Sequence, residues 1–356
     1  MNQEQRGGKL IGQGVYGCAF DPPLICKNKT NLKPGRKIGK ITSQEDADHE
    51  YTITKYLQQL PFAEEYFILI DNICQPNPRT NQVEKSIKNC KPLENQNLTK
   101  FSQLIMSFGG KPLLNLSSTL TKDSVMKLSQ KILEAGTLLL LGNIVHGDLH
   151  GYNVLVDSQG NARCIDFGFA WNVKQLTLST VNQLIHDFAP YILQETPESS
   201  VIDGIQNNIS QNYIFAKIGD EKNMLSILYK LTGRTIEDQL QELDRFTKTS
   251  ISFRNRDWLS FFKIYWTKID AWAFGNLIMY MFLNILDNHE KEDEIQQLFQ
   301  VILGLCEMDP GKRLDAAEAL EILAPQSKVL ELEEVKQWLI KQKQLRDDLL
   351  QKIGVQ

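Results

Sequence analysis

The chain has 356 residues, of which 42% are hydrophobic and 23% are charged. At roughly 150 residues a domain, this length predicts about two domains, and the hydrophobic share excludes a disordered chain because it suffices for a sizeable core. The 39 lysine and arginine residues nearly balance the 43 aspartate and glutamate residues, and the net charge is −4. This balance argues against nucleic acid as the main partner.

Neither a membrane segment nor a signal peptide is expected. The strongly apolar runs near residues 138–141 and 277–286 are shorter than the roughly 18 residues that cross a bilayer. The polar residues 1–5 lack the apolar core of a signal peptide. We therefore expect a soluble, intracellular protein that does not bind a membrane.

The six cysteines are spread along the chain without a C-x-x-C pair or a cluster of histidines. This spacing favours neither a zinc site nor a disulfide framework, so we expect free thiols in a reducing compartment. The residues concerned are Cys18, Cys26, Cys74, Cys90, Cys164 and Cys306.

The N-terminal part of the chain carries short strand patterns around one helical pattern. The predicted strands cover residues 9–11, 18–20, 37–42, 66–72 and 104–107. Apolar residues at helical spacing predict one helix over residues 47–60. Glu50 falls on the apolar face of this helix, where a carboxylate needs a partner.

From about residue 120 the pattern becomes mainly helical. Residues 124–141 are a predicted helix, and residues 153–165 have the pattern of a strand, a turn and a second strand. The charged residues 331–353 carry an apolar stripe, which predicts a helix packed on its own domain.

These patterns predict three parts of the chain. The first covers residues 1–108 with a polar insertion at about 74–99, and the second covers residues 109–325 with an insertion at about 199–269. Residues 326–356 form a C-terminal helical extension. Glycine and proline at 108–112 indicate a hinge between the first two parts.

The sharpest chemical signal is His146-Gly147-Asp148-Leu149-His150-Gly151-Tyr152-Asn153, followed 13 residues later by Asp166-Phe167-Gly168. Phosphoryl transfer needs a carboxylate that orients and deprotonates the attacking hydroxyl, and this role suits Asp148. It also needs oxygen ligands that hold magnesium against the phosphates, and this role suits Asn153 and Asp166. The two segments match H-R-D-L-x-x-x-N and D-F-G at every fixed position except Gly147, and so resemble a protein-kinase catalytic core.

A second motif is the glycine pattern G-x-G-x-x-G at residues 12–17. The same spacing serves dinucleotide folds, but strand-type residues follow it here, and then Pro22-Pro23, which excludes the helix that such folds require. A hairpin whose backbone lies over ATP phosphates, as in kinases, fits better. Ala19 stands where the kinase pattern has the valine that packs against the base.

Two lysines are candidates for holding the α- and β-phosphates. Lys37 and Lys40 both lie on the predicted strand 37–42, and we favour Lys40 because Ile38 shares its face in a pattern close to V-A-I-K. Glu50 is the expected ion-pair partner of Lys40, although only ten residues separate them.

Three later segments resemble elements of the helical lobe of protein kinases. Residues 270–275 resemble the D-x-W-x-x-G element that opens a buried helix, and residues 309–313 resemble the late arginine segment. Thr196-Pro197-Glu198 stands in the place of A-P-E. The resemblance implies that Arg313 pairs with Glu198 and that Asp270 braces the catalytic loop.

The resemblance spans residues 8–325, and the pattern is similar to that of the protein-kinase-like family of large cytoplasmic DNA viruses. Chains of that family tend to have a G-x-Y-G-C loop, here residues 14–18, and H-G-D-x-H in the catalytic loop. The resemblance implies an α+β, two-lobed fold with a small β-rich N-lobe and a larger, mainly α-helical C-lobe. It also implies a monomeric serine/threonine protein kinase that uses ATP and Mg²⁺ on protein hydroxyls, in a host cytoplasm or a virion.

The same resemblance assigns the site residues. The catalytic residues would be Asp148, Lys40 and His150, and the metal ligands Asn153 and Asp166. The residues that bind the nucleotide would be Gly12, Gly14, Gly17, Ala19, Lys40, Glu50, Met106, Ser107, Phe108 and Leu155.

Two positions depart from a typical serine/threonine kinase. Gly147 replaces the arginine that reads a phosphorylated activation segment, so we expect activity that does not depend on phosphorylation of residues 169–197. His150 replaces the lysine two residues after the catalytic aspartate. It either packs within the loop or contacts the transferring phosphate.

Two alternative functions stay open. H-G-D-x-H-x-x-N also resembles the loop of small-molecule kinases of the aminoglycoside or choline kinase kind, although Phe167-Gly168, Trp272 and Arg313 favour a protein kinase. The second alternative is a catalytically idle nucleotide-binding scaffold. The intact Asp148 and Asp166 argue against it.

Overall fold

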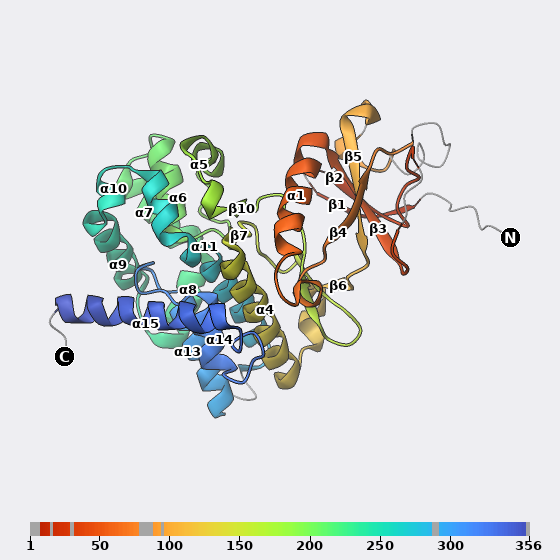
Figure 1. Ribbon diagram of the computed structural model, residues 1–356. Helices are drawn as coiled ribbons and strands as arrows, with labels where there is room; N and C mark the ends of the chain where they lie inside the picture. Colours follow the sequence, from red (N-terminus) through yellow and green to blue (C-terminus); the bar gives the residue numbers. More distant parts are fainter. Residues whose placement is uncertain are drawn as a thin grey trace. The chain divides into compact units, whose positions relative to one another are not determined.

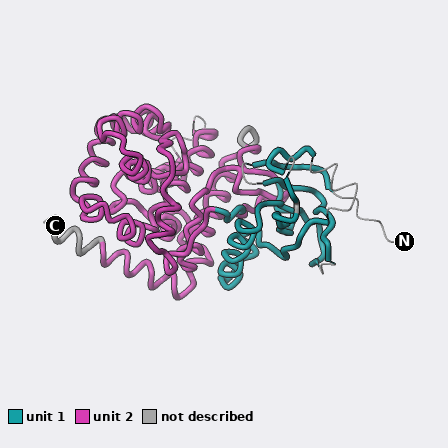
Figure 2. Tube along the Cα trace, turned by 90° about the horizontal axis from the view of Figure 1, so that it is seen from above, with its two compact units in different colours: residues 1–110, 165–168 teal, residues 111–164, 169–356 magenta. Residues whose placement is uncertain are grey.

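The computed structural model describes residues 8–14, 17–28, 32–77, 88–93, 96–286 and 292–353. The chain divides into two compact units (Figure 2): unit 1 comprises residues 1–110 and 165–168, and unit 2 comprises residues 111–164 and 169–356. Unit 1 is built on a β-sheet, and unit 2 is mainly helical (Figure 1). The expected α+β, two-lobed kinase-like fold class is confirmed.

The sheet of unit 1 has five strands in the order β1-β2-β3-β5-β4, and each neighbouring pair is antiparallel. The strands are β1 (Lys9–Gln13), β2 (Gly17–Asp21), β3 (Lys37–Ser43), β4 (Ile70–Cys74) and β5 (Phe101–Ser107). The strand expected over residues 66–72 begins later, at Ile70, because Ala63–Tyr66 form the short helix α2. The order places β3 in the centre of the sheet.

Helix α1 (Gln44–Leu57) follows β3 directly and packs against β4 and β5 (Figure 1). Ser43 caps its start, because its hydroxyl accepts a hydrogen bond from Asp46 N at 3.1 Å. The predicted apolar face is confirmed, since Ala47, Ile53 and Leu57 are buried. Glu50 lies buried on the same face, so the packing of this helix encloses a carboxylate.

The alternation of side chains along the strands separates the two faces of the sheet. Phe20 and Ile41 belong to the hydrophobic cluster on one face. Leu104 packs with Ala47 of α1 on the other face. Since successive residues of a strand point to opposite faces, Lys40 lies on the face that α1 covers.

Two disulfides correct the expectation of free thiols. They join Cys18 to Cys90 and Cys26 to Cys74. The paired residues are 72 and 48 positions apart, and the fold of unit 1 brings them together, which linear spacing does not reveal. Cys164 and Cys306 are free and buried, and burial raises the pKa of both thiols to about 12. Because four of the six cysteines are paired, the cysteines no longer indicate a reducing compartment.

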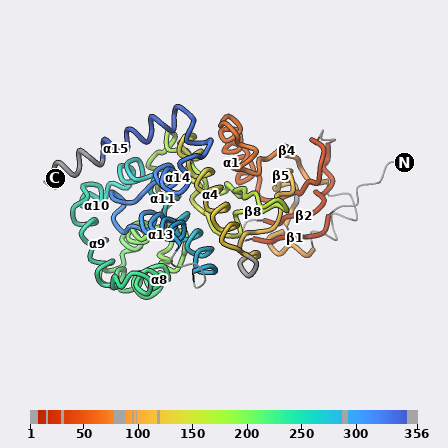
Figure 3. The backbone as a smooth tube through the Cα atoms, turned by 90° about the horizontal axis from the view of Figure 1, so that it is seen from below, coloured from red at the N-terminus to blue at the C-terminus, as the bar shows by residue number. Residues whose placement is uncertain are grey.

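The helices of unit 2 follow one another along most of its length. They are α4 (Lys122–Gly142), α5 (Leu178–Leu184), α6 (Pro197–Gln206), α7 (Gln211–Glu221), α8 (Asn223–Thr232), α9 (Ile236–Thr249), α10 (Ile251–Arg254), α11 (Trp258–Phe282), α13 (Asp293–Leu305), α14 (Ala316–Leu323) and α15 (Glu333–Ile353). Helix α4 packs against α11 and α14, and α11 packs against α13 (Figure 3). The helix predicted over residues 124–141 is thus confirmed as α4, and its buried face forms much of the core.

One expected helix start is wrong. Residues 270–275 do not open a helix but lie in the middle of α11, which begins at Trp258. The start is set by Asp257, whose carboxylate accepts a hydrogen bond from Ser260 N at 3.0 Å. Asp270 is therefore held on a rigid, buried helix.

The predicted strand, turn and strand at 153–165 are confirmed as the hairpin β8 (Val154–Val156) and β9 (Ala162–Cys164). The Asp157 carboxylate closes the turn by accepting hydrogen bonds from Gln159 N and Asn161 N. Strand β6 (Lys111–Pro112) pairs with β8 on its other side.

The C-terminal stretch is helical, as predicted: α15 contacts α4 and α14. In the described part of the chain, no helix has both the length and the apolar character that a bilayer crossing requires. Residues 1–5, and residues 78–87 and 94–95 of the expected first insertion, lie outside the described residues. The status of 74–99 and 199–269 as insertions stays a prediction.

Candidate active site

Lys40 lies at the centre of the sheet of unit 1. In the strand register it stands opposite Ala19 of β2 and Leu104 of β5. Its Nζ lies 2.7 Å from Glu50 Oε2 and 2.7 Å from Asp166 Oδ1. A strand, a helix and the Asp166-Phe167-Gly168 segment thus meet at one ammonium group within unit 1.

The charges of this cluster stabilise one another. Burial by itself would lower the pKa of Lys40, but the negative charges of Glu50 and Asp166 outweigh it and raise that pKa above its ordinary value. Burial raises the pKa of Glu50, while Lys40 and a hydrogen bond from the Phe167 backbone favour its charged form. Phe167 itself is buried against Phe67, with the ring centroids 5.9 Å apart. The carboxylates are therefore fixed by both charge and packing.

Lys37 has other partners. Its Nζ lies 2.5 Å from Asp71 Oδ2 and 2.9 Å from Ser107 Oγ. It lies three residues before Lys40 and therefore on the opposite face of β3. The two lysines are thus distinguished by geometry, and the lysine that meets Glu50 is Lys40.

The glycine motif forms the turn between β1 and β2. Gly14 N donates a hydrogen bond to Gly17 O at 2.9 Å. A Cβ atom on Gly17 would lie 2.0 Å from Ile41 O, so only glycine allows β2 to approach β3 this closely. Val15 and Tyr16 lie outside the described residues. Gly12 pairs with Ala19 across the hairpin.

The other residues assigned to the nucleotide lie at strand ends and in the short hairpin. Met106 and Ser107 end β5, and Phe108 N then donates to Arg36 O at 3.0 Å. Leu155 lies in β8 of unit 2 and is 8% exposed. Their role in binding a base stays a prediction.

The catalytic-loop motif of unit 2 is held in place by Asp270, which lies more than 120 residues later in the sequence. The Asp270 carboxylate accepts hydrogen bonds from His146 N at 2.6 Å and from Gly147 N at 3.0 Å, which confirms the expected bracing. Gly147 has a φ of +76°, and a Cβ atom there would lie 2.8 Å from Phe169 O. This backbone disfavours any larger side chain, which gives a physical reason for the missing arginine.

Asp148 is surrounded by donors. Its Oδ1 accepts a hydrogen bond from Gln194 Nε2 at 2.7 Å, and its Oδ2 lies 3.3 Å from Asn153 Nδ2. Asn153 Nδ2 also donates to the Asp148 backbone carbonyl at 2.9 Å. Because Nδ2 makes these contacts, Oδ1 is the atom of Asn153 that can serve as a metal ligand.

His150 makes its observed contacts inside the loop. Its Nδ1 accepts a hydrogen bond from Tyr152 N at 3.2 Å, and its Nε2 lies 3.7 Å from Asp148 Oδ2. Nε2 also lies 3.3 Å from Asn153 Nδ2, so it faces both a carboxylate acceptor and an amide donor of the same loop. A direct contact between His150 and the transferring phosphate stays a prediction.

The donor chemistry suits the groups that a kinase binds. Carboxylate and amide oxygens such as those of Asp166 and Asn153 are the ligands that Mg²⁺ prefers in proteins. Lys40, a half-buried cation, matches a phosphate. Sequence reasoning missed Gln194, because nothing in its local pattern marks a residue that reaches Asp148 from 46 positions away.

Two comparisons with known proteins bear on this geometry. Residues 94–184 match the RIO domain family, a segment that contains both the catalytic-loop motif and Asp166-Phe167-Gly168. The chain is also 26% identical to mitogen-activated protein kinase kinase kinase 3 of Homo sapiens over 198 residues, 52% of this chain and 27% of that protein. The two matches support the protein kinase superfamily.

The Mus musculus protein of the same name gives a similar result, with 27% identity over 186 residues, or 49% of this chain and 25% of that protein. The chain thus spans about a quarter of the length of these curated relatives. The kinase-like fold of the two units and the sequence similarity agree.

Proposed function

We propose that this protein is an ATP-dependent phosphotransferase, and specifically a serine/threonine protein kinase. The observation that carries the proposal is the ammonium group of Lys40, held between Glu50 and Asp166 at 2.7 Å from each. In protein kinases, transfer requires the strand lysine to be paired with a helix glutamate and the D-F-G aspartate to be in place. A merely structural ion pair would not need a third partner from Asp166-Phe167-Gly168.

In this proposal each residue has a distinct task. Bound ATP would supply the transferable phosphoryl group, and Mg²⁺ would offset the negative charge of its phosphates. Lys40 binds the α- and β-phosphates, and the oxygens of Asn153 and Asp166 hold the metal. Asp148 accepts the proton of the acceptor hydroxyl while the oxygen of that hydroxyl forms a bond to the γ-phosphorus. The bond between the γ-phosphorus and the β-phosphate oxygen breaks at the same time, and ADP is released.

The finer parts of the proposal rest on motif similarity. H-G-D-x-H and the glycine loop are similar to those of the kinase-like family of large cytoplasmic DNA viruses. Protein hydroxyls are preferred as acceptors because Phe167-Gly168, Trp272 and Arg313 follow the protein-kinase pattern rather than that of small-molecule kinases.

The test is a transfer assay with γ-labelled ATP and Mg²⁺. Acceptors are serine/threonine peptides, tyrosine peptides, and a panel of aminoglycosides and choline. Asp148→Asn should abolish transfer while leaving nucleotide binding intact, because its proposed contact is with the acceptor hydroxyl. The matched control is Asp220→Asn, an exposed aspartate on α7 of the same unit.

Labelled serine or threonine in the wild type, lost in Asp148→Asn, supports the proposal. Transfer only to small molecules would instead establish the small-molecule kinase. Nucleotide binding without transfer by the wild type would establish the idle scaffold.

A further inference from the structure

Gln194 contacts the candidate base. Its Nε2 donates to Asp148 Oδ1 at 2.7 Å, while Asn153 and His150 lie on the side of Oδ2 at 3.3 and 3.7 Å. The side chain of Asp148 is 26% exposed, so one hydrogen bond has much influence on its orientation. Gln194 therefore fixes one of the two carboxylate oxygens.

The segment that carries Gln194 is held by buried donors. Trp272 Nε1 donates to the carbonyl of Leu193 at 3.0 Å. Lys222 Nζ donates to the carbonyls of Pro190 and Ile192, both at 3.1 Å. Trp272 and Lys222 are 0% and 1% exposed. The backbone before Gln194 is thus tied to α11 and to the start of α8.

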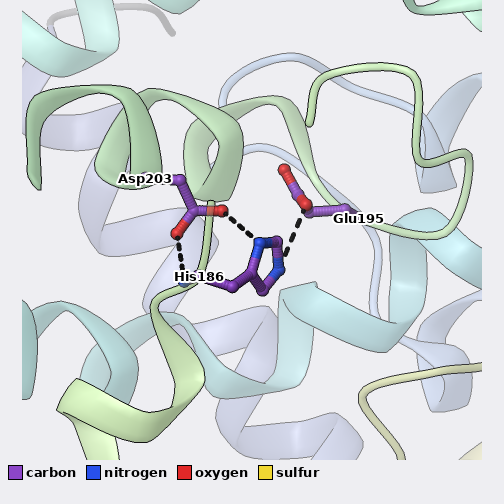
Figure 4. Close-up of side chains that lie close together, drawn as sticks. All are labelled: His186, Glu195 and Asp203. Carbon is purple, nitrogen blue, oxygen red and sulfur yellow. Dashed lines mark hydrogen bonds and ion pairs between the residues drawn. The ribbon is translucent and has the colours of Figure 1, made fainter. Parts of the chain in front are cut away.

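The residue after Gln194 belongs to a second cluster, shown in Figure 4. His186 lies between two carboxylates: Nδ1 is 3.2 Å from Asp203 Oδ2, and Nε2 is 3.4 Å from Glu195 Oε2. The backbone N–H of His186 donates to Asp203 Oδ1 at 3.2 Å, and its Nδ1 also lies 3.0 Å from the carbonyl of Asp187. Asn207 Nδ2 donates to the His186 carbonyl at 2.9 Å. His186 thus joins the N-terminal part of this segment, Glu195 and helix α6.

In the described part of the chain, the polar groups that face the His186 ring are all acceptors. Nδ1 hydrogen-bonds to the Asp187 carbonyl, while Asp203 Oδ2 and Glu195 Oε2 lie within ion-pair distance of the ring and have no hydrogen-bond partner among the described residues. A metal ion would instead need a ring nitrogen with a free lone pair. A positive charge on the ring would stabilise the two buried carboxylate oxygens that lack a hydrogen bond, so these contacts suit an imidazolium ion.

The surrounding charges agree with a protonated ring. Glu195 and Asp203 are buried carboxylates, and Lys222, the cation packed against them, offsets one of the two charges. Glu198 is neutralised separately by Arg313. Burial lowers the pKa of His186, but the charges of Asp203, Glu195 and Asp187 outweigh it and raise that pKa. Burial and Glu195 raise the pKa of Asp203 to about 7, and burial lowers that of Lys222 to about 8.

We propose that Gln194 is a positioning residue for Asp148 and that protonated His186, bridging Asp203 and Glu195, holds Gln194 in place. The inference rests on the proposed phosphotransferase function and deepens it. Asp148 then presents Oδ2 to the acceptor hydroxyl while Oδ1 is occupied by Gln194. Loss of the bridge leaves Glu195 held only through Oε1, which accepts a hydrogen bond from Ser200 Oγ, and so loosens the adjacent Gln194.

The first test removes the donor. Gln194→Met keeps the length of the side chain but cannot donate, and we expect kcat to fall about tenfold, equivalent to ~1.4 kcal/mol, with the KM for ATP unchanged. Gln194→Lys restores a donor and should recover most of the lost kcat. Gln241→Met is the matched control, because it removes an exposed glutamine–carboxylate contact on α9.

The second test addresses the bridge. His186→Asn removes the cation, whereas His186→Arg keeps a cation that can donate to two carboxylates at every pH. Because the folded-state pKa of His186 is raised, its positive charge is lost as pH rises through that pKa. The pKa of Asp203 is raised to about 7, so the negative charge of Asp203 is lost as pH falls through that value. The bridge therefore weakens on both sides, and the alkaline loss is the one that reports on His186. The wild type should therefore lose kcat on the alkaline side, and His186→Asn should be impaired throughout. His186→Arg should show a smaller alkaline loss, because only Lys222, with a pKa of about 8, still titrates there.

The outcomes separate this inference from the proposed function. A wild type without transfer contradicts the proposed function, whereas an active wild type with unchanged kcat in Gln194→Met overturns only the positioning role. An alkaline loss that is identical in His186→Arg overturns the bridge. Micromolar Zn²⁺ binding that calorimetry detects in the wild type but not in His186→Asn would also overturn the bridge. Equal urea unfolding curves for wild type and Gln194→Met separate positioning from a loss of fold.

Discussion

Arg313 and Glu198 form a completely buried, two-pronged ion pair. Arg313 Nη1 lies 2.7 Å from Glu198 Oε1, Nη2 lies 2.9 Å from Oε2, and both side chains are 0% exposed. The remaining donors of Arg313 bind the carbonyls of Lys268 and Glu307. The pairing expected from the sequence is confirmed, and it joins α6 to the segment before α14.

We expect the loss of one member of this pair to destabilise unit 2 strongly. Glu198→Gln leaves the Arg313 cation buried and uncompensated, which typically costs about 3–5 kcal/mol in the free energy of unfolding. Urea unfolding followed by circular dichroism measures this. Lys343→Met, which breaks an exposed pair with Glu321, is the control and should change little. A Glu198→Gln protein as stable as the control would contradict the argument.

Lys40 and Lys37 provide a matched pair for the nucleotide site. Lys40→Met should lower transfer by about 10²–10³-fold, because a preorganised charge facing the phosphates is lost. Lys37→Met removes the partner of Asp71, and so it also costs stability, but transfer by the folded fraction should stay close to the wild type. Initial rates and unfolding curves for both variants separate activity from stability. The opposite ranking of rates would mean that the lysine has been misassigned.

Transfer should not depend on phosphorylation of residues 169–197. Gly147 supplies no guanidinium to bind a phosphate, and buried Lys222 and Trp272 already hold the backbone carbonyls of this segment. Phosphatase-treated enzyme and the variant Ser179→Ala/Thr180→Ala should keep near-full rates on a serine/threonine peptide. Thr177 is left unchanged because its hydroxyl caps α5. A drop of tenfold or more, ~1.4 kcal/mol, would show that a phosphate orders the segment.

The disulfides predict a redox-dependent stability of unit 1. Mass spectrometry after alkylation in denaturant should count two free thiols, those of Cys164 and Cys306. Removing one bridge with Cys18→Ser/Cys90→Ser should lower the free energy of unfolding by about 2–5 kcal/mol. Reductant should destabilise the wild type and leave a variant lacking all four paired cysteines unaffected. Six alkylated thiols without reductant would refute the pairing.

The sequence alone determined the features that depend on local pattern. Helical spacing placed Glu50 on the buried face of α1, and alternation with Ile38 favoured Lys40 on β3. Motif spacing also grouped Asp148 and Asn153, since five residues of one loop suffice to bring their side chains into contact. Such relations span a few residues, so the periodicity of helix and strand fixes them.

Only the tertiary structure decided the contacts between distant residues. Lys40 and Lys37 are distinguished by their partners, Glu50 and Asp71, which lie on other elements. The pairing of Cys18 with Cys90 and the contact of Gln194 with Asp148 also join residues that are far apart in the sequence. Helix α11 also begins a dozen residues before Asp270, because the cap at Asp257 and tertiary packing set its start. These features depend on sheet register and on how helices pack, which no local periodicity encodes.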